Sequence, residues 1–328
     1  HVLTLAGPHA PFYALSKGVE VRHLNVAKPS GTALSALCNN CVRLRDLRRT
    51  LRSIKPDMTI GFMDRTNVLT LLASRGLGFP VIATEHTVPG YWPLGRVWEQ
   101  LRRLTYPWAS RVVVPTRAGA EDFSQRVPGR YEAIPNPVSI PHGEALSGLP
   151  HPLLISMGRL STEKNFQTLL HAFAATRHEH PDWSLAILGE GPARVELEAL
   201  AARLGLSGGL LLPGNIAEPF AWLRAADLFV LTSHFEGFSY ALAEAMACGL
   251  PSVAVDCPFG PGELLEDGRS GFLVPPQDEP TLVRAMSRLM ADGSLRREMA
   301  QAAKDRASRF NPEAIFSLWD KLMGSILR

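Results

Sequence analysis

The sequence lacks the features that define several protein classes. No apolar run approaches the roughly 20 residues that cross a bilayer, so no transmembrane helix is predicted. The chain has only four cysteines, and Cys38 and Cys41 form a CxxC pair without a second pair and without histidines at ligand spacing. The sequence therefore predicts no zinc centre and no redox disulfide. It favours free thiols in a cytoplasmic protein.

A dinucleotide-binding fingerprint is also incomplete. Gly189 and Gly191 lie in a turn between a strand-like run and a helical pattern, but Arg194 stands where the third glycine is needed. No acidic residue is well placed to bind a ribose in this arrangement. An NAD-dependent enzyme is therefore a weak interpretation. The turn either lies near a nucleotide or is only structural, and the sequence does not decide between the two.

What the sequence does contain is a regular alternation of strand-like and helical patterns. Its 328 residues suggest about two domains. In the first half, strand-like runs at 19–24, 57–62, 80–84 and 111–115 alternate with helical patterns at 34–54, 66–75, 93–106 and 117–126. Such alternation predicts a parallel, doubly wound sheet.

The second half repeats this plan after a linker. Five prolines within residues 135–152 mark the linker. We therefore predict an α/β fold with two Rossmann-like domains, which bind ligands in a cleft between facing sheet ends. The predicted bounds are 1–143 for the first domain, 144–310 for the second, and 311–328 for an amphipathic terminal helix.

The most informative stretch is residues 232–251, TSHFEGFSYALAEAMACGLP. It has the pattern of a strand end, a tight loop and a helix that begins around Ser239. Gly237 allows a ligand to approach the backbone closely, Ser239 can cap the helix, and Gly249 can end it. The loop, which includes Phe238, therefore aims free N–H groups and a helix N-terminus at an anion.

Two carboxylates accompany this predicted anion site. Glu236 lies in the loop, and Glu244 lies eight residues later on the helix. Carboxylates do not bind phosphate, so a ligand served by both features would carry a diphosphate and sugar hydroxyls. The alternative is a favourable acidic helix start and a solvated face, and the spacing alone favours that simpler interpretation.

Three further residues are candidates for the same ligand. Arg159 and Lys164, within GRLSTEKN, follow a strand-like run and could converge on a diphosphate, although they could equally be two solvated cations. His86 follows the strand-like run PVIAT. A lone histidine is more often a structural residue, but the carboxyl end of a strand is where sites gather in such folds.

The block 235–278, with GRLSTEKN at 158–165 and TEHT at 84–87, resembles the retaining glycosyltransferases of family 4. The resemblance covers nearly the whole chain and is close to members that extend polyprenyl-diphosphate-linked or lipopolysaccharide-type glycans. It implies a GT-B fold and the transfer of a hexose or N-acetylhexosamine from a nucleoside-diphosphate sugar. The donor is expected to be UDP-linked, and the acceptor a lipid-linked saccharide of the cell envelope.

The resemblance also implies a role for each candidate residue. Glu236 and His86 would be the catalytic residues, both in contact with the donor sugar. The nucleotide is expected at Arg159, Lys164, Gly237, Phe238, Ser239 and Glu244, with the two cations on the diphosphate and Glu244 on the ribose. No Asp-x-Asp clamp occurs in the chain, so neither a metal nor another cofactor is predicted.

Charge is unevenly distributed along the chain. Residues 1–143 carry 18 Lys and Arg against 9 Asp and Glu, whereas residues 144–328 carry 16 against 22. Within the basic half, the stretches 42–55 and 91–111 combine arginines with leucines or with aromatics such as Trp98 and Trp108. They predict peripheral binding to an anionic membrane, with 91–111 the better candidate because it combines basic and aromatic residues; the alternative is solvated basic faces. No nucleic-acid partner is predicted.

Three other functions remain open from the sequence: a UDP-sugar epimerase of the same fold, an NAD-dependent oxidoreductase, and a non-catalytic nucleotide-binding or membrane-surface module. The chain begins at His1 inside a strand-like run, whereas the resembling family opens with an earlier strand and a glycine-rich loop. We therefore expect an N-terminally truncated sequence that binds a nucleoside diphosphate but transfers sugar poorly.

Overall fold

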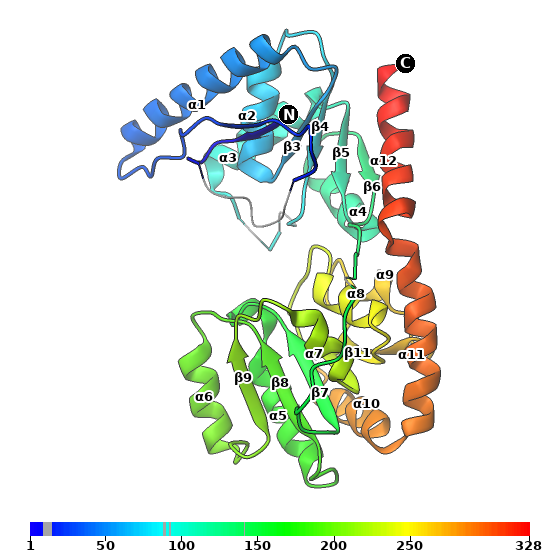
Figure 1. Ribbon diagram of the computed structural model, residues 1–328. Helices are drawn as coiled ribbons and strands as arrows, with labels where there is room; N and C mark the ends of the chain where they lie inside the picture. Colours follow the sequence, from blue (N-terminus) through cyan, green and yellow to red (C-terminus); the bar gives the residue numbers. More distant parts are fainter. Residues whose placement is uncertain (9–14, 88–89, 92, 141) are drawn as a thin grey trace. The chain divides into compact units, whose positions relative to one another are not determined.

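The computed structural model describes residues 1–8, 15–87, 90–91, 93–140 and 142–328. They divide into two compact units. Unit 1 comprises His1–Val114, Glu121–Glu132 and Met323–Arg328, and unit 2 comprises Pro115–Ala120 and Ala133–Leu322. Each unit is an α/β structure built on parallel strands (Figure 1). Among the described helices, none is both long and apolar enough to cross a membrane.

Unit 2 contains a six-stranded parallel sheet with the strand order β12-β11-β10-β7-β8-β9. Its strands are β7 (Leu153–Met157), β8 (Ser184–Leu188), β9 (Leu210–Gly214), β10 (Leu228–Leu231), β11 (Ser252–Val255) and β12 (Gly271–Val274). The chain adds β8 and β9 on one side of β7 and then crosses to add the other three strands on the opposite side. The loops after β7 and β10 are therefore neighbours at the point where the winding reverses, which is where such sheets bind ligands.

Helices cover both faces of this sheet. Leu154 of β7 belongs to an apolar cluster that includes α5 (Phe166–Arg177), α6 (Arg194–Arg203) and α10 (Glu279–Ala291). Its neighbours Leu153 and Ile155 belong to a second cluster that includes α7 (Pro219–Ala225), α8 (Tyr240–Ala247), α9 (Pro261–Leu264) and α11 (Gly293–Ala307). Because successive side chains of a strand point to opposite faces, the strands must be apolar almost throughout.

Unit 1 contains two parallel sheets. The larger has the order β3 (Thr59–Phe62), β4 (Val81–Thr84), β5 (Arg111–Val114) and β6 (Tyr131–Ala133). The smaller pairs β1 (Val2–Thr4) with β2 (Val21–His23). The helices of this part of the chain are α1 (Ala33–Ile54), α2 (Asp64–Ser74), α3 (Arg96–Thr105), the 3-10 turn η1 (Tyr106–Trp108) and α4 (Arg117–Arg126), whose first four residues are grouped with unit 2.

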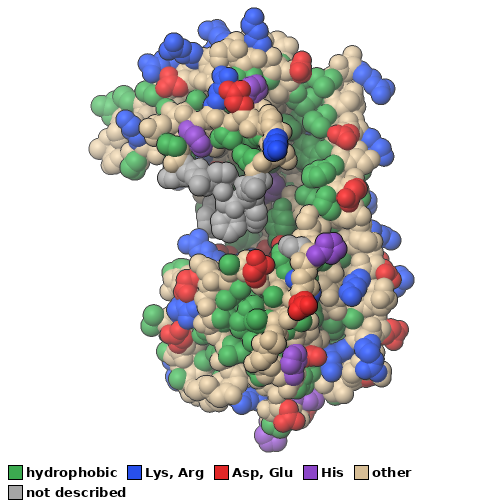
Figure 2. All heavy atoms as spheres, viewed as in Figure 1, with side chains coloured by type: hydrophobic (Ala, Val, Ile, Leu, Met, Phe, Trp, Pro, Cys, Tyr) green, Lys and Arg blue, Asp and Glu red, His purple; other side chains and the backbone are tan. Residues whose placement is uncertain are grey.

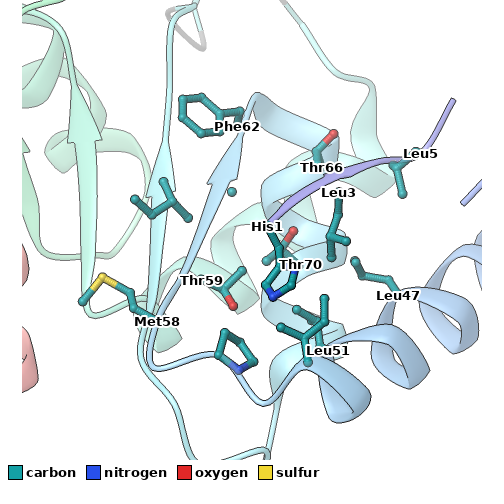
Figure 3. A pocket seen from close by; sticks show the side chains of 14 residues that line it. His1, Leu3, Leu5, Leu47, Leu51, Met58, Thr59, Phe62, Thr66 and Thr70 are labelled. Carbon is teal, nitrogen blue, oxygen red and sulfur yellow. The ribbon is translucent and has the colours of Figure 1, made fainter. Parts of the chain in front are cut away.

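A cavity of about 380 Å³ lies between β1 and β3 (Figure 3). Figure 3 shows Leu3 of β1 and Leu5 just after it on one side, and Thr59 and Phe62 of β3 on the other. The leucines Leu47 and Leu51 of α1 and the threonines Thr66 and Thr70 of α2 also contribute to the lining. Among the described strands, β1 and β3 are both at the edges of their sheets. The cavity is therefore bordered by two strand edges.

Most predicted elements occur within a few residues of their expected bounds, as α1 does. The terminal helix is α12 (Pro312–Leu327). Strand β6 was not predicted, because its three residues, YEA, carry no apolar alternation. Helix α3 begins three residues later than predicted, after Gly95, whose φ of 88° is not helical. The described residues of the proline-rich segment 135–152 contain no helix or strand.

Candidate functional site

The loop between β10 and α8 in unit 2 is held against the loop that follows β7. The hydroxyl of Thr232 donates to the carbonyl oxygens of Lys164 at 3.1 Å and of Asn165 at 3.0 Å. The backbone N–H of His234 donates to the carbonyl oxygen of Glu163 at 2.8 Å. The sequence separates these segments by about 70 residues, and the β7-β10 pairing brings them together.

Within this contact, Glu236 and Lys164 form a direct ion pair. The Lys164 Nζ lies 2.7 Å from Glu236 Oε1, and the Ser233 hydroxyl donates to the same oxygen at 2.7 Å. The Glu236 side chain is only 8% exposed and that of Lys164 23%. A buried carboxylate needs such partners, because removal from water disfavours its charge. Lys164 and Glu236, which the sequence predicts to bind the same ligand, are therefore in contact.

Ser239 occupies the N-cap position of α8, but its predicted capping hydrogen bond is absent. Its backbone angles, φ −77° and ψ 84°, depart from the extended conformation usual at caps, so the hydroxyl does not reach the N–H groups of the first turn. The Ser239 Oγ is buried without a hydrogen-bond partner among the described residues. The prediction that the Ser239 side chain caps α8 was therefore wrong. The buried Ser239 hydroxyl is therefore a polar group that no described residue satisfies.

The remaining predicted residues of this loop differ in exposure. Phe238 is 7% exposed, packs edge-on against Tyr240 and Phe310, and belongs to the core, so its ring is not available to a ligand. Gly237 is half-exposed. Glu244 is half-buried within α8, and burial raises the pKa of its carboxyl group to about 7.

A second cavity, of about 410 Å³, lies at the carboxyl ends of β7, β8 and β9. Arg159 lines it together with Gly189 and Glu190 of the turn after β8. Sequence reasoning missed the other contributors after β9, Asn215 and Ile216. Their only sequence signal is their place after a strand-like run, where sites gather.

The glycine turn after β8 also has a structural cause. A Cβ atom on Gly189 would lie 1.9 Å from the carbonyl oxygen of Gly158, and one on Gly191 would lie 2.3 Å from that of Leu160. The turn therefore packs its backbone directly on the GRLS loop that carries Arg159. The turn is therefore a packing element, and it also lines the cavity.

In unit 1, His86 follows β4 in a half-buried position. Its ring stacks on Phe62 of β3, with centroids 6.2 Å apart and planes 9° apart. Burial lowers the pKa of His86 below its usual value, so the imidazole is neutral at pH 7. The preceding Glu85 is completely buried.

The cysteines agree with the expectation of free thiols. All four are free, with Cys38 and Cys41 exposed and Cys257 buried. Among the described residues, no group of three or more His, Cys, Asp or Glu side chains is arranged to hold a metal ion.

Two family models match the chain. Residues 144–306 match the model described as glycosyl transferases group 1, and residues 1–137 match the model described as glycosyl transferase 4-like domain. Together they leave only a short middle segment and the C-terminal segment unmatched.

Similar proteins include enzymes named for saccharide transfer or exopolysaccharide chemistry. An exopolysaccharide phosphotransferase of Streptomyces coelicolor is 34% identical over 65% of this chain, but the match spans only 22% of that protein. An α-1,4-N-acetylgalactosaminyltransferase of Campylobacter jejuni, named for a diphospho-undecaprenol-linked acceptor, is 27% identical over 99% of this chain and 91% of its own. The solved structure of Anabaena HepE with UDP-glucose is 24% identical with a TM-score of 0.77, over 86% of this chain and 82% of that one.

The HepE structure shares the fold of this chain, and the two family models together match nearly all of its sequence. With the reversed winding of the unit 2 sheet, they lead to one conclusion. The chain belongs to the glycosyltransferases of the GT-B fold.

Proposed function

We propose that this protein is a retaining glycosyltransferase that moves a hexose or N-acetylhexosamine from a UDP-sugar to a lipid-linked saccharide of the bacterial cell envelope. The observation that carries the proposal is the Lys164–Glu236 pair at the winding reversal, beside the cavity lined by Arg159. The UDP-glucose bound to Anabaena HepE supports a uridine donor, and the Campylobacter relative supports a polyprenyl-diphosphate acceptor.

The charges in unit 2 suit a departing nucleoside diphosphate. Arg159 and Lys164 would neutralise the diphosphate as the sugar bond breaks, and the uncapped start of α8 with the Ser239 hydroxyl would add hydrogen bonds. The leaving group can then be stabilised without a metal ion. We therefore propose metal-independent transfer.

The carboxylates would bind hydroxyl groups. Glu244 would accept hydrogen bonds from the ribose, and Glu236 from the donor sugar, with one of its oxygens already oriented by Ser233 and Lys164. We propose that His86, in unit 1, contacts the transferred sugar as a neutral imidazole, which can donate one hydrogen bond and accept another. The retaining stereochemistry rests on the family resemblance.

The test is transfer from a donor panel. Purified protein is incubated with UDP-, GDP- and ADP-sugars and a short-chain polyprenyl-diphosphate saccharide, with and without EDTA. We expect a lengthened acceptor and released UDP from one UDP-sugar, at the same rate in EDTA. A new epimer of the donor sugar without acceptor would indicate an epimerase, and loss of transfer in EDTA would contradict the metal-independent mechanism.

We also propose that α1 binds an anionic membrane surface. Figure 2 shows Lys and Arg side chains gathered over the region that α1 occupies in Figure 1. Arg48 is engaged internally, donating to the carbonyl oxygens of Ala73 and Arg75, but Arg49 and Arg52 are exposed. The exposed leucines Leu34 and Leu37 extend this face.

The aromatic candidates for membrane binding are less accessible than expected. Trp98 and Trp108 are half-buried beneath the guanidinium groups of Arg65 and Arg75. The third, Trp92, lies outside the described residues. We therefore expect α1 to dominate binding: an Arg49→Ala, Arg52→Ala double variant should co-sediment several-fold less with anionic vesicles at low salt. Binding that is insensitive to salt and to these changes would refute the role of α1.

A further inference from the structure

A buried polar cluster that the proposed reaction does not use lies directly before His86. Glu85, the residue between β4 and His86, is 0% exposed. It meets Asn67 of α2 and Tyr106 of η1, both also 0% exposed. Burying three polar side chains beside one another is costly unless they satisfy one another, so the cluster requires an explanation.

The cluster ties the end of β4 to its neighbours. The Tyr106 hydroxyl donates to Glu85 Oε1. The Asn67 Nδ2 donates to the carbonyl oxygen of Thr84 at 2.7 Å and reaches Glu85 Oε1 at 3.5 Å. The Glu85 backbone N–H donates to Val113 of β5 at 2.9 Å. The backbone that leads into His86 is therefore held by α2, η1 and β5 together.

The hydrogen bonding of the cluster is incomplete. Glu85 Oε2 and Asn67 Oδ1 are both buried acceptors without a partner among the described residues. A proton on the Glu85 carboxyl group would convert one orphan acceptor into a donor, whereas the ionised form would leave a negative charge out of water.

The charged groups around Glu85 do not fully offset the cost of burying its negative charge. Arg102 of α3 lies close enough to favour ionisation; its Nη2 bonds both oxygens of Glu99, at 2.6 and 2.7 Å, and its buried Nε has no partner among the described residues. Asp64 of α2 opposes ionisation, and the hydrogen bond from Tyr106 favours it. Burial is the largest effect, and it raises the pKa of Glu85 to about 7.

We propose that Glu85 is a positioning residue for His86: in its protonated form it closes the cluster with Asn67 and Tyr106 and fixes the His86 ring on Phe62, and its ionisation releases that ring. The inference rests on the proposed contact of His86 with the donor sugar. Glu85 does not itself touch the substrate in this scheme. It makes turnover depend on pH near neutrality.

Turnover should fall as pH rises, because the protonated form of Glu85 is the one that orders the His86 ring. Turnover should be highest below pH 7 and fall by about tenfold for each pH unit well above it, as for loss of one essential proton. In the same window the folded state binds a proton that the unfolded chain does not, so the free energy of unfolding decreases as pH rises from 4.5 to about 7.

The experiment uses the full chain and three variants. Glu85→Gln imitates the protonated acid, Tyr106→Phe removes the hydroxyl that favours ionisation, and Tyr131→Phe is the matched control. The Tyr131 hydroxyl donates to the Val127 carbonyl oxygen at 2.9 Å, so this variant keeps the hydrogen bonds of Glu85 while testing a tyrosine that Glu85 influences only through space. The first readout is the NMR signal of the His86 imidazole against pH. The second is the pH profile of turnover at saturating donor, with UDP affinity measured alongside.

In the unaltered chain we expect a step in the His86 signal near pH 7, separate from the titration of His86 itself at lower pH. The step should vanish in Glu85→Gln, move to higher pH in Tyr106→Phe, and stay in Tyr131→Phe. Turnover of Glu85→Gln should lose its fall above pH 7, with UDP affinity unchanged.

The proposal is overturned if the step persists in Glu85→Gln or if Tyr131→Phe moves it as far as Tyr106→Phe. Should Glu85→Gln fail to fold, the direction of the shift in Tyr106→Phe decides alone. If no donor is transferred at any pH, the proposed function fails, but the His86 signal still reports whether Glu85 positions the ring.

Discussion

At the scale of single residues, variants of Lys164 and Glu236 should separate nucleotide binding from sugar transfer. Lys164→Ala and Arg159→Ala should each weaken UDP binding by roughly 1.5–3 kcal/mol, because each removes a charge-assisted contact with the diphosphate. Glu236→Gln keeps the size of the side chain and should lower turnover at least tenfold with little change in UDP affinity. Calorimetric titration with UDP checks the first effect, and initial rates check the second.

Arg203→Ala is the matched control, since Arg203 is exposed in the last turn of α6 and away from the winding reversal. It should leave UDP affinity unchanged. If Arg159→Ala binds UDP as tightly as this control, the cavity at the ends of β7, β8 and β9 does not hold the diphosphate.

Glu244 should make nucleotide affinity depend on pH in the direction opposite to that of turnover. Burial raises its pKa to about 7, so it is largely protonated at pH 6 and ionised at pH 8. An ionised carboxylate accepts ribose hydroxyls more strongly, by about 1 kcal/mol or roughly fivefold. UDP affinity relative to Glu244→Gln should therefore rise about fivefold from pH 6 to pH 8. The ratio cancels the titration of UDP itself, and a constant ratio would remove Glu244 from the ribose.

At the scale of elements, the turn after β8 is the least tolerant connection in unit 2. Gly189 has a φ of 140°, and a Cβ there would lie 1.9 Å from the Gly158 carbonyl oxygen. We expect Gly189→Ala to lower the free energy of unfolding of unit 2 by about 2–4 kcal/mol, through backbone strain and displacement of the GRLS loop. Urea titration of unit 2 signals measures this.

Gly208→Ala provides the comparison, because a Cβ there meets only Arg177, at 4.0 Å. It should change stability by less than about 0.5 kcal/mol. An equally small effect of Gly189→Ala would mean that the GRLS loop can move away without loss.

Local sequence patterns predicted these elements well, but not the contacts between them. The apolar runs of β7 and β10 and the glycine-rich turn are visible in short windows, since alternation and φ requirements act over a few residues. The Lys164–Glu236 contact depends on the β7-β10 pairing, and the Glu85–Tyr106 contact depends on how η1 packs behind β4. The Ser239 cap failed because the backbone at Ser239 departs from the extended conformation that a cap requires, which the residue type alone does not show.

At the scale of the whole molecule, the split sheet of unit 1 predicts where the chain is least protected. The N–H groups of Thr59 and Met63 donate to carbonyl oxygens at the two ends of β4, at 3.1 Å each. The N–H groups of the intervening Ile60 and Phe62 therefore point to the other edge of β3, toward the cavity. The backbone N–H of Leu3 in β1 likewise points away from β2. Unpaired amides beside a cavity exchange with solvent without unfolding.

Hydrogen exchange followed residue by residue therefore has a clear expected outcome. Ile60, Phe62 and Leu3 should exchange at least a hundredfold faster than Thr59 and Met63, which serve as controls within and beside the same strand. The interior strands β7 and β10 of unit 2, paired on both edges, should be the slowest of all. Equally slow exchange at Ile60 and Thr59 would show that the outer edge of β3 is covered in solution, and that the cavity of Figure 3 is not open to water.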